Sequence, residues 1–238
     1  MGSKSFQFKQ FSVVQNHSAH KVGTDGVLLG CWVRIGATDR QILDIGTGSG
    51  LIALMAAQRS SGGTIIDAVE IESLDAQQAA ENVIRSPWPE KIRIHHAPVQ
   101  QFFPEKLYDL IVTNPPYFEN SLLSPEKKRS RARHTLQLTF EELLGAVSRL
   151  LSTRGRLAII LPNAGGLRFI DLARAWGLIP IRQASFRARI HKPVERLLLE
   201  FAYEGDQQPE THITLYAEGE TWSEEYQALT REFYIREA

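Results

Sequence analysis

The chain has 238 residues, enough for one large domain or for one domain with extensions. Its single cysteine, Cys31, excludes an internal disulfide and fits a reducing compartment, and every apolar run stays well short of the roughly 20 residues that span a membrane. The formal net charge is zero, yet residues 1–203 carry 25 basic and 18 acidic side chains, whereas residues 204–238 carry 2 and 9. Because the first residues lead into no apolar stretch, we expect no signal peptide, no membrane contact and a cytoplasmic location.

Two segments precede the first predicted core strand. Apolar residues from Phe6 to Val13 alternate loosely with polar ones and predict a short hairpin. A helix that contains Leu28 and Leu29 is expected to follow, and either Thr24 or Asp25 has a side chain suited to cap it. Thr24 is also a candidate ligand contact, because its segment directly precedes the strand that leads into the glycine-rich loop.

A nucleotide-binding unit is predicted next. Residues 41–45 are expected to form a strand and residues 51–59 a helix. The loop between them allows close approach of a ligand to the backbone, since glycine has no Cβ. A second strand at 64–69 ends in Glu70, 22 positions after Gly48, the interval expected for a carboxylate that binds ribose hydroxyls. The remaining candidate binding residues belong to the loop and its strand: Asp44, Gly46, Gly48 and Gly50.

The glycine spacing distinguishes two kinds of nucleotide. A dinucleotide-binding loop has the pattern G-x-G-x-x-G, but here the third glycine comes one residue early and Leu51 takes its place. The pattern D-x-G-x-G-x-G is instead typical of class I methyltransferases. The predicted cofactor is therefore S-adenosylmethionine, with S-adenosylhomocysteine as product. Many such enzymes place Asp or Ser after the third strand to contact the cofactor adenine. Here the third strand, 91–95, is followed by Ala97-Pro98-Val99-Gln100, so we expect this contact from backbone groups of Val99 or from Gln100.

A chemical motif, Asn114-Pro115-Pro116-Tyr117, follows a predicted buried strand at 108–113. An exocyclic amine on a base, or a glutamine amide, is a poor nucleophile because its lone pair is delocalised. The side-chain carbonyl of Asn114 and the backbone carbonyl of Pro115 can accept its two hydrogens, and the prolines fix the backbone that holds them. Tyr117 offers a π-face for stacking. The motif therefore predicts methylation of a planar nitrogen.

Basic residues form two groups. A solvated loop is the usual explanation of a charge run. The first group begins ten residues after Tyr117, beside the predicted pocket, where a polyanion would need a basic lining; it comprises Lys127, Lys128, Arg129, Arg131 and Arg133. For the second group the solvated and RNA-binding interpretations both stay open, with Arg187 and Arg189 as candidate RNA contacts; it comprises Arg182, Arg187, Arg189, Lys192 and Arg196.

The alternation of strand and helix patterns predicts an α/β fold. Further helices are expected near 72–85, with Leu74 and Ala80 on one face, near 139–151, with a capping box from Thr139 to Glu142, and near 166–176. Further strands are expected near 155–161, and at 178–186 and 196–203 as an antiparallel pair. The class I pattern implies a mostly parallel seven-stranded sheet with an antiparallel end strand.

We expect one compact domain with three parts. Residues 1–40 would supply a hairpin and helix on the cofactor site, residues 41–204 the methyltransferase core, and residues 205–238 an acidic C-terminal extension. In that extension, Tyr226, Leu229 and Phe233 are expected to pack back on the domain. The histidines have no cysteine nearby and no carboxylate at ligand spacing, so we expect no metal site.

The chain resembles the bacterial tRNA adenine-N6 methyltransferases that modify adenine 37 of a valine tRNA. The resemblance runs nearly end to end and rests on the motifs above, on residues 15–29 and on the tail 230–234. It implies a flipped adenine stacked on Tyr117, with its N6 held by Asn114 and Pro115. It also implies tRNA as the partner, and a monomer is expected. Flipping suits a base in an anticodon loop, which is already poorly paired.

Three other functions remain open at this stage. Glutamine methylation of a protein such as a release factor uses the same Asn-Pro-Pro-Tyr motif, but that family usually carries a helical domain before the cofactor strand, and only 40 residues precede it here. Methylation of guanine in ribosomal RNA is a close relative of the tRNA reaction. A non-catalytic RNA-binding protein is opposed by the intact Asn114 and glycine loop.

Overall fold

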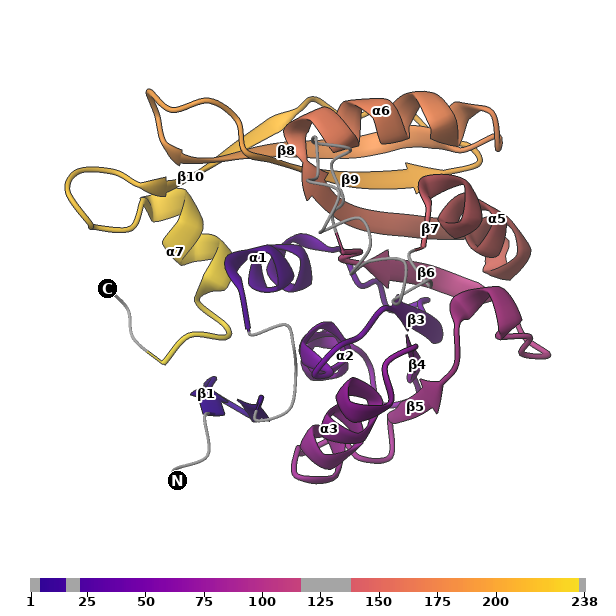
Figure 1. Cartoon of the computed structure of the whole chain (residues 1–238). Coiled ribbons are helices and arrows are strands. Elements are labelled where there is room, and N and C mark those ends of the chain that lie inside the picture. The colour runs from indigo at the N-terminus through magenta and orange to yellow at the C-terminus, as the bar shows by residue number, and fades with distance from the viewer. Residues whose placement is uncertain (1–4, 16–21, 117–137, 236–238) are drawn as a thin grey trace, which may run out of the picture.

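The computed structural model describes residues 5–15, 22–116 and 138–235. Its centre is an eight-stranded sheet, shown in Figure 1. From one edge to the other the strands are β10 (Thr211–Tyr216), β8 (Ile179–Arg189), β9 (Arg196–Ala202), β7 (Leu151–Pro162), β6 (Tyr108–Thr113), β3 (Gln41–Ile45), β4 (Ile65–Glu70) and β5 (Ile92–His96).

The strand directions confirm the predicted α/β architecture and correct two details. All strands of this sheet run the same way except β9, which is antiparallel to both of its neighbours, β7 and β8. The antiparallel strand therefore lies inside the sheet and not at its end. The sheet also has one strand more than expected, because β10 pairs in parallel with the outer side of β8.

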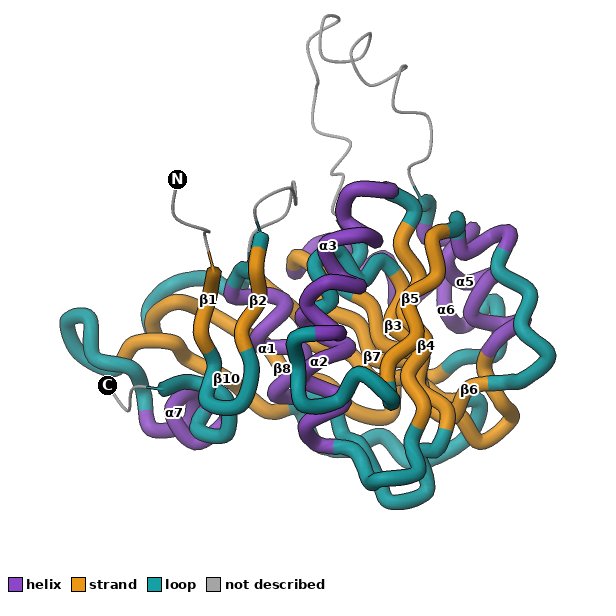
Figure 2. The backbone as a smooth tube through the Cα atoms, turned by 90° about the horizontal axis from the view of Figure 1, so that it is seen from below, coloured by secondary structure: helices purple, strands orange, loops and turns teal. Residues whose placement is uncertain are grey.

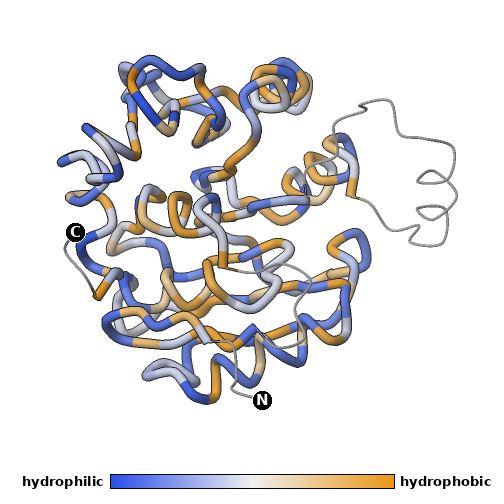
Figure 3. The backbone as a smooth tube through the Cα atoms, turned by 60° about the vertical axis from the view of Figure 1, so that its left-hand side comes forward, coloured by the Kyte–Doolittle hydropathy of each residue, from blue (hydrophilic) through white to orange (hydrophobic). Residues whose placement is uncertain are grey.

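The helices cover both faces of the sheet. Helices α5 and α6 lie on one face, and α1, α2 and α3 on the other (Figure 1). Their bounds are α1 (Thr24–Trp32), α2 (Leu51–Arg59), α3 (Ser73–Ile84), α5 (Phe140–Leu150), α6 (Asn163–Arg174) and α7 (Glu224–Thr230), with a 3₁₀ turn η1 (Val99–Gln101). Helices α5 and α6 bury one apolar face on the sheet, whereas most residues of α1 and α2 are buried. Figure 3 shows how apolar and polar residues are distributed along the backbone. No helix in the described ranges has both the length and the apolar composition to cross a membrane.

Local sequence signals explain several element boundaries. The predicted capping box is confirmed: the Thr139 hydroxyl accepts from the Glu142 amide, and the Glu142 carboxylate accepts from the Thr139 amide. Strand β7 begins at Leu151, directly after α5 ends and four residues before the predicted start. Gly155 lies within it, and a Cβ there would come 2.7 Å from the Tyr108 carbonyl, so this close approach of β6 requires glycine.

The two ends of the chain pack together beside α1 and α2. Strands β1 (Ser5–Gln7) and β2 (Ser12–Val14) form the predicted hairpin, a separate two-stranded sheet that lies next to α7 (Figure 2). The Lys9 amide donates to the Phe233 carbonyl (2.8 Å), and Phe8 contacts the rings of Phe233 and Tyr234. Tyr226 and Phe233 are buried, so the prediction that the tail packs back on the domain is confirmed.

Candidate active site

Three neighbouring strand ends bring the predicted cofactor and catalytic residues to one edge of the sheet. Ile45 at the end of β3 is paired with Val69 of β4 and with Thr113 of β6, and the Thr113 hydroxyl donates to the Ile45 carbonyl (2.9 Å). The next residues along these strands are Gly46, Glu70 and Asn114. The chain turns from β3 toward β4 on one side and returns to β6 on the other, so these residues flank the switch point of the sheet, where α/β proteins bind ligands.

The glycine loop has a backbone that only glycine adopts readily. Gly46 has φ 72° and Gly48 has φ 56°, both in the left-handed region. A Cβ added to either residue would meet no atom within 4 Å, so each of these backbone positions faces open space. Gly50, with φ 85°, is the N-cap of α2 and packs against Ala79 of α3. The loop therefore leaves room at Gly46 and Gly48 for a ligand to approach the backbone.

Glu70 closes the other side of this loop. Its Oε2 accepts from the Gly48 amide (2.8 Å), and its Oε1 accepts from the amides of Ile71 (2.8 Å) and Glu72 (2.9 Å). The side chain is 7% exposed. An ionised carboxylate has about four lone-pair sites, so three backbone donors leave capacity for a further donor. Glu70 thus both orders the loop and keeps an acceptor for a ribose hydroxyl.

Asp44 lies beneath the loop, on β3. Its Oδ2 accepts from the Thr47 hydroxyl (2.6 Å) and the Ala53 amide (3.1 Å). Its Oδ1 is buried and has no hydrogen-bond partner in the described structure. Burial raises the pKa of this carboxyl to about 7, although the bonds from Thr47 and Ala53 oppose the rise. A cationic or hydrogen-bonding group of a ligand would satisfy this acceptor, and such a group fits the donor set of S-adenosylmethionine.

The described part of the catalytic motif ends at Pro116. Asn114 is partly buried, Pro115 is buried and Pro116 is exposed. Helix α1 packs against this point: a Cβ on Gly26 would lie 3.0 Å from Leu51 and 3.9 Å from the Asn114 side-chain nitrogen. Gly26 was not predicted as a site residue, since a single glycine in a helix carries no signal of its own. Tyr117 lies outside the described residues.

Helix α1 is fixed at both ends. Its N-cap is Gly23, which makes no side-chain capping bond, so the expected cap by Thr24 or Asp25 is wrong. The Asp25 carboxylate instead pairs with Arg196 at the start of β9 (2.8 Å), and Thr24 is exposed on the first turn. Thr24 therefore lies at the end of α1 whose first turn, through Gly26, approaches Asn114.

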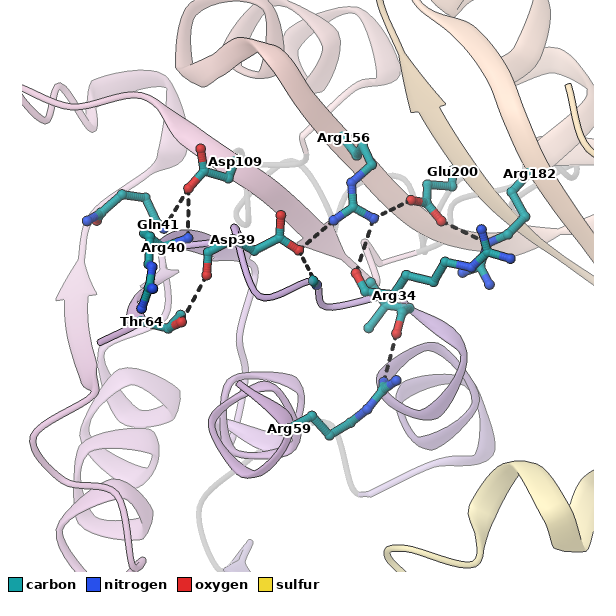
Figure 4. Close-up of polar contacts among 12 residues, drawn as sticks. Arg34, Asp39, Arg40, Gln41, Arg59, Thr64, Asp109, Arg156, Arg182 and Glu200 are labelled. Atoms are coloured by element: carbon teal, nitrogen blue, oxygen red, sulfur yellow. Dashed lines mark hydrogen bonds and ion pairs between the residues drawn. The ribbon is translucent and has the colours of Figure 1, made fainter. Parts of the chain in front are cut away.

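Arginines hold the other end of α1 through its unpaired carbonyls. Arg59 donates to the carbonyls of Gly30, Cys31 and Val33. Arg182 donates to the Trp32 carbonyl (2.8 Å) and stacks on its ring. Glu200 joins Arg182 to Arg156, which also pairs with Asp39 (Figure 4). Arg182 is therefore committed to a buried network and is not part of a basic surface.

The remaining predicted residues follow β5 or lie at the end of β8, or fall outside the described residues. Val99 begins η1 after β5, its side chain is buried, and its carbonyl accepts from Arg149 (2.9 Å). This carbonyl is therefore committed to a bond within the protein. Arg187 and Arg189 lie at the end of β8 and are partly exposed. The first basic group, Lys127 to Arg133, lies outside the described residues.

Asn82 is a site residue that the sequence did not predict. Its Nδ2 donates to the carbonyls of Ser49 (2.8 Å) and Val14 (2.9 Å), and its Oδ1 accepts from the Val14 amide (2.9 Å). It ties the glycine loop to β2. The prediction that Leu74 lies on the apolar, buried face of α3 was wrong, because Leu74 is 62% exposed while Asn82 of the same helix is buried. The one sequence clue to the packing of α3 on the glycine loop was the small residue Ala79, against which Gly50 packs.

Proteins of similar sequence carry methyltransferase names. The family model described as "Methyltransferase small domain" matches residues 17–178. The tRNA1(Val) (adenine(37)-N6)-methyltransferase of Parabacteroides distasonis is 42% identical over 241 residues, covering 99% of this chain and 100% of its own length. The protein of the same name from Trichodesmium erythraeum is 41% identical over 239 residues, with coverage of 99% and 100%.

Solved structures show the same fold at low identity. A protein from Agrobacterium tumefaciens, described as a predicted O-methyltransferase, has a TM-score of 0.64 at 16% identity, covering 88% of this chain and 96% of that one. The CcbJ methyltransferase from Streptomyces caelestis has a TM-score of 0.53 at 13% identity, covering 74% and 94%. At these identities the likeness concerns the fold alone, and it matches the fold class predicted from the glycine loop.

Proposed function

Because this chain belongs to the family of the tRNA1(Val) (adenine(37)-N6)-methyltransferases, we propose that it transfers a methyl group from S-adenosylmethionine to N6 of adenine 37 in a valine tRNA. One observation carries the proposal: β3 and β6 are paired so that Gly46 and Asn114 directly follow partner residues. The loop for a methyl donor and the acceptors for an amine are thus one strand spacing apart, about 5 Å.

The cofactor would be held by groups already described. When bound, S-adenosylmethionine supplies an electrophilic methyl group on a sulfonium centre. The open backbone at Gly46 and Gly48 accommodates its approach, Glu70 accepts from its ribose hydroxyls, and the unpartnered Asp44 Oδ1 accepts from a donor beneath the loop. We propose that Thr24 contacts the methionine end of the cofactor. Since the Val99 carbonyl is already bonded to Arg149, Val99 would contribute its amide to the cofactor adenine.

The acceptor amine would be shaped by the catalytic motif. The Asn114 side-chain oxygen and the Pro115 carbonyl accept its two N–H groups, which draws the nitrogen out of the plane of the ring and frees its lone pair. Pro115 and Pro116 fix φ, so the two acceptors are already oriented before the base arrives. No strong base is needed, because the methylated nitrogen carries a positive charge and readily loses a proton to water.

The target base would leave its stack to reach these groups. An adenine in an anticodon loop is poorly paired, so extruding it costs only a few kcal/mol. Tyr117 would stack on it, and the basic residues Lys127, Lys128, Arg129, Arg131 and Arg133 would line the path of the phosphate backbone. A tRNA substrate accords with the expected cytoplasmic location, and we propose that a monomer without metal suffices.

The test uses methyl-labelled S-adenosylmethionine and total tRNA from bacterial cells that lack this enzyme, followed by digestion to nucleosides. We expect labelled N6-methyladenosine in a single tRNA species. Asn114→Ala should lower kcat by on the order of 10²-fold or more, because the reacting amine loses an acceptor, while the dissociation constant of S-adenosylhomocysteine stays within about twofold.

A matched control is Asn163→Ala, since Asn163 directly follows β7, the strand next to β6. This variant should keep its activity within about twofold. Parallel reactions supply ribosomal RNA or a release factor in place of tRNA. Label in methylguanosine of that RNA, or on a glutamine of that protein, with none in tRNA, would contradict the proposed substrate. Full activity of Asn114→Ala would contradict the proposed role of the motif.

A further inference from the structure

One face of the sheet at its β10 edge carries a stripe of polar, basic and aromatic side chains. Strands β8 and β10 are parallel, and their register places three residue pairs side by side. Because side chains alternate between faces, every second residue points the same way. We call this set the β8–β10 stripe: Ser185, Arg187 and Arg189 of β8, and His212, Thr214 and Tyr216 of β10.

Side-chain contacts confirm that these residues share a face. The Ser185 hydroxyl and His212 Nδ1 lie 2.7 Å apart, and the Arg189 guanidinium lies 5.1 Å from the centre of the Tyr216 ring. The residues that alternate with the stripe along the two strands include Ala184, Phe186 and Ile213, which belong to the hydrophobic core on the opposite face. The stripe therefore points away from α1 and α7.

Helix α6 covers the neighbouring strand on this face but leaves most of the stripe accessible. A Cβ on Gly166 of α6 would lie 2.9 Å from Leu197 of β9, which is paired with Ser185. Ser185 is accordingly buried, whereas Arg187, Arg189 and Tyr216 are partly exposed and the His212 side chain is 60% exposed. The stripe thus runs from the edge of α6 out to the last strand of the sheet.

The stripe lies at the same edge of the sheet as the catalytic motif. Strand β8 runs parallel to β6 and β7, so its last residue, Arg189, lies at the edge where β6 leads into Asn114. Two strands, β9 and β7, separate β8 from β6. Three strand spacings put β8 about 14 Å from β6 across the sheet, and the register places Arg189 six residues beyond the level of Thr113. Arg189 and the catalytic motif are therefore roughly 20–25 Å apart, a separation that one nucleic-acid stem can bridge.

The charge of the stripe is available for a partner. Within the described residues, no ion pair involves Arg187 or Arg189; Arg187 donates only to the Ile190 carbonyl. The other two arginines of the second basic group differ, because Arg182 is held by Glu200 and Arg196 by Asp25. Two carboxylates lie close by: Glu195 accepts from the Ala188 amide (3.3 Å), and Glu210 lies 4.0 Å from His212.

We propose that the β8–β10 stripe binds the sugar-phosphate backbone of the RNA substrate outside the catalytic pocket, an inference that rests on the proposed function. Free guanidinium groups form paired hydrogen bonds to phosphates. Tyr216 and His212 add flat rings suited to stacking on a base or ribose. The stripe therefore positions the tRNA, whereas Asn114 and Pro115 act on the base.

The test compares Arg187→Gln/Arg189→Gln with the wild type on unmodified bacterial tRNA. We expect the KM for tRNA to rise about tenfold and kcat at saturating tRNA to change little, because the stripe touches only the backbone. The slope of log K against log salt should fall by roughly one for each phosphate that the variant no longer binds. The dissociation constant of S-adenosylhomocysteine, measured by calorimetry, should not change, which also shows that the variant is folded.

Two further variants complete the test. Arg187→Lys/Arg189→Lys keeps the charge and should retain most of the salt slope. Arg93→Gln/Arg154→Gln removes two exposed arginines on other strands and should leave the KM for tRNA unchanged. An unchanged KM and salt slope in Arg187→Gln/Arg189→Gln, with a wild type that methylates tRNA, would overturn the role of the stripe alone. A wild type that neither binds nor methylates tRNA would overturn the proposed function and the stripe together.

Discussion

Asn82 donates a hydrogen bond to the Ser49 carbonyl across 2.8 Å, joining helix α3 to the glycine loop. The same side chain makes two bonds to Val14 of the N-terminal hairpin. Other bonds also shape the loop: among them, the amides of Gly46 and Thr47 donate to the Val69 carbonyl, and the amide of Gly48 donates to Glu70. Asn82 thus makes the cofactor loop depend on a hairpin more than 30 residues earlier in the chain.

Asn82→Ala should weaken cofactor binding. The variant leaves the Ser49 and Val14 carbonyls without their donor, and the loop loses its link to α3. We expect the dissociation constant of S-adenosylhomocysteine to rise about tenfold or more, a loss of roughly one hydrogen bond or more. Calorimetry measures this constant, and thermal unfolding measures the accompanying loss of stability.

The control for Asn82→Ala is a variant that is destabilised elsewhere. Phe169→Leu removes part of a fully buried ring between α6 and the sheet, on the face opposite to the hairpin. It should lower the unfolding temperature and leave the dissociation constant unchanged. If both variants bind S-adenosylhomocysteine as the wild type does, Asn82 only stabilises the fold.

Glu70→Gln should damage the same site in a second way. The substitution replaces one carboxylate oxygen by an NH₂ group, which then faces backbone N–H donors of Gly48 or of Ile71 and Glu72. We expect cofactor affinity to fall by about 10- to 100-fold, because a charged acceptor is worth roughly 1.5–3 kcal/mol. Glu72→Gln, at the exposed neighbour, should bind normally. Equal affinities of the two variants would remove Glu70 from the cofactor site.

The core of the fold was predictable because its strands carry local signals. Strands β3 and β6 begin and end where the apolar runs 41–45 and 108–113 do. Strand β10 was missed because only Ile213 of its six residues is buried, so it has no continuous apolar run. Its position is set by pairing with β8, which is a tertiary contact that the sequence pattern does not encode.

The same limit applies to individual polar residues. Asp44, Glu70 and Asn114 were predictable because they follow a strand or glycine pattern at known spacing. Asn82 carried no signal in the sequence and Arg182 belonged to a run of basic residues, whereas the structure buries Asn82 and draws Arg182 into the network with Glu200 and Trp32. A buried polar group is stable only with its partners, and those partners lie between 18 and 150 residues away along the chain.

Asp44 should make the stability of the ligand-free protein depend on pH. Its pKa is about 7 in the folded protein, against 3.8 for the unperturbed group. Between these values the folded state holds a proton that the unfolded state has lost, so the contribution of Asp44 to stability falls as pH rises from about 4 to about 7. At ~1.4 kcal/mol per pKa unit the change is on the order of a few kcal/mol.

Asp44→Asn isolates this contribution. The amide oxygen still accepts from Thr47 and Ala53, but the side chain no longer titrates. Urea unfolding at several pH values between about 5 and 8 gives the free energy of unfolding for both proteins. We expect the difference between variant and wild type to grow in favour of the variant as pH rises through this range. A difference independent of pH would show that Asp44 is ionised throughout.

Cys31 should report on the attachment of the C-terminal segment. The thiol is buried in α1, and burial raises its pKa to about 12, with Glu232 of the tail adding to the rise and Arg59 opposing it. At pH 8 the thiolate fraction is then about 10⁻⁴, so we expect the native protein to react with an aromatic disulfide reagent only when α1 becomes exposed. Labelling in denaturant should be complete within seconds to minutes.

Phe233→Ala tests whether the tail is what covers this thiol. Phe233 is 1% exposed and belongs to the same hydrophobic cluster as Cys31, and its carbonyl accepts from Lys9 of the hairpin. Truncating the ring should cost about 3–5 kcal/mol of local packing and accelerate native-state labelling by at least tenfold, as measured by stopped-flow absorbance. Phe169→Leu lies on the other face of the sheet and should accelerate labelling only as far as it lowers global stability. If the two variants have the same free energy of unfolding and label Cys31 at the same rate, the thiol is exposed by global unfolding. Local detachment of the tail would then play no part in its exposure.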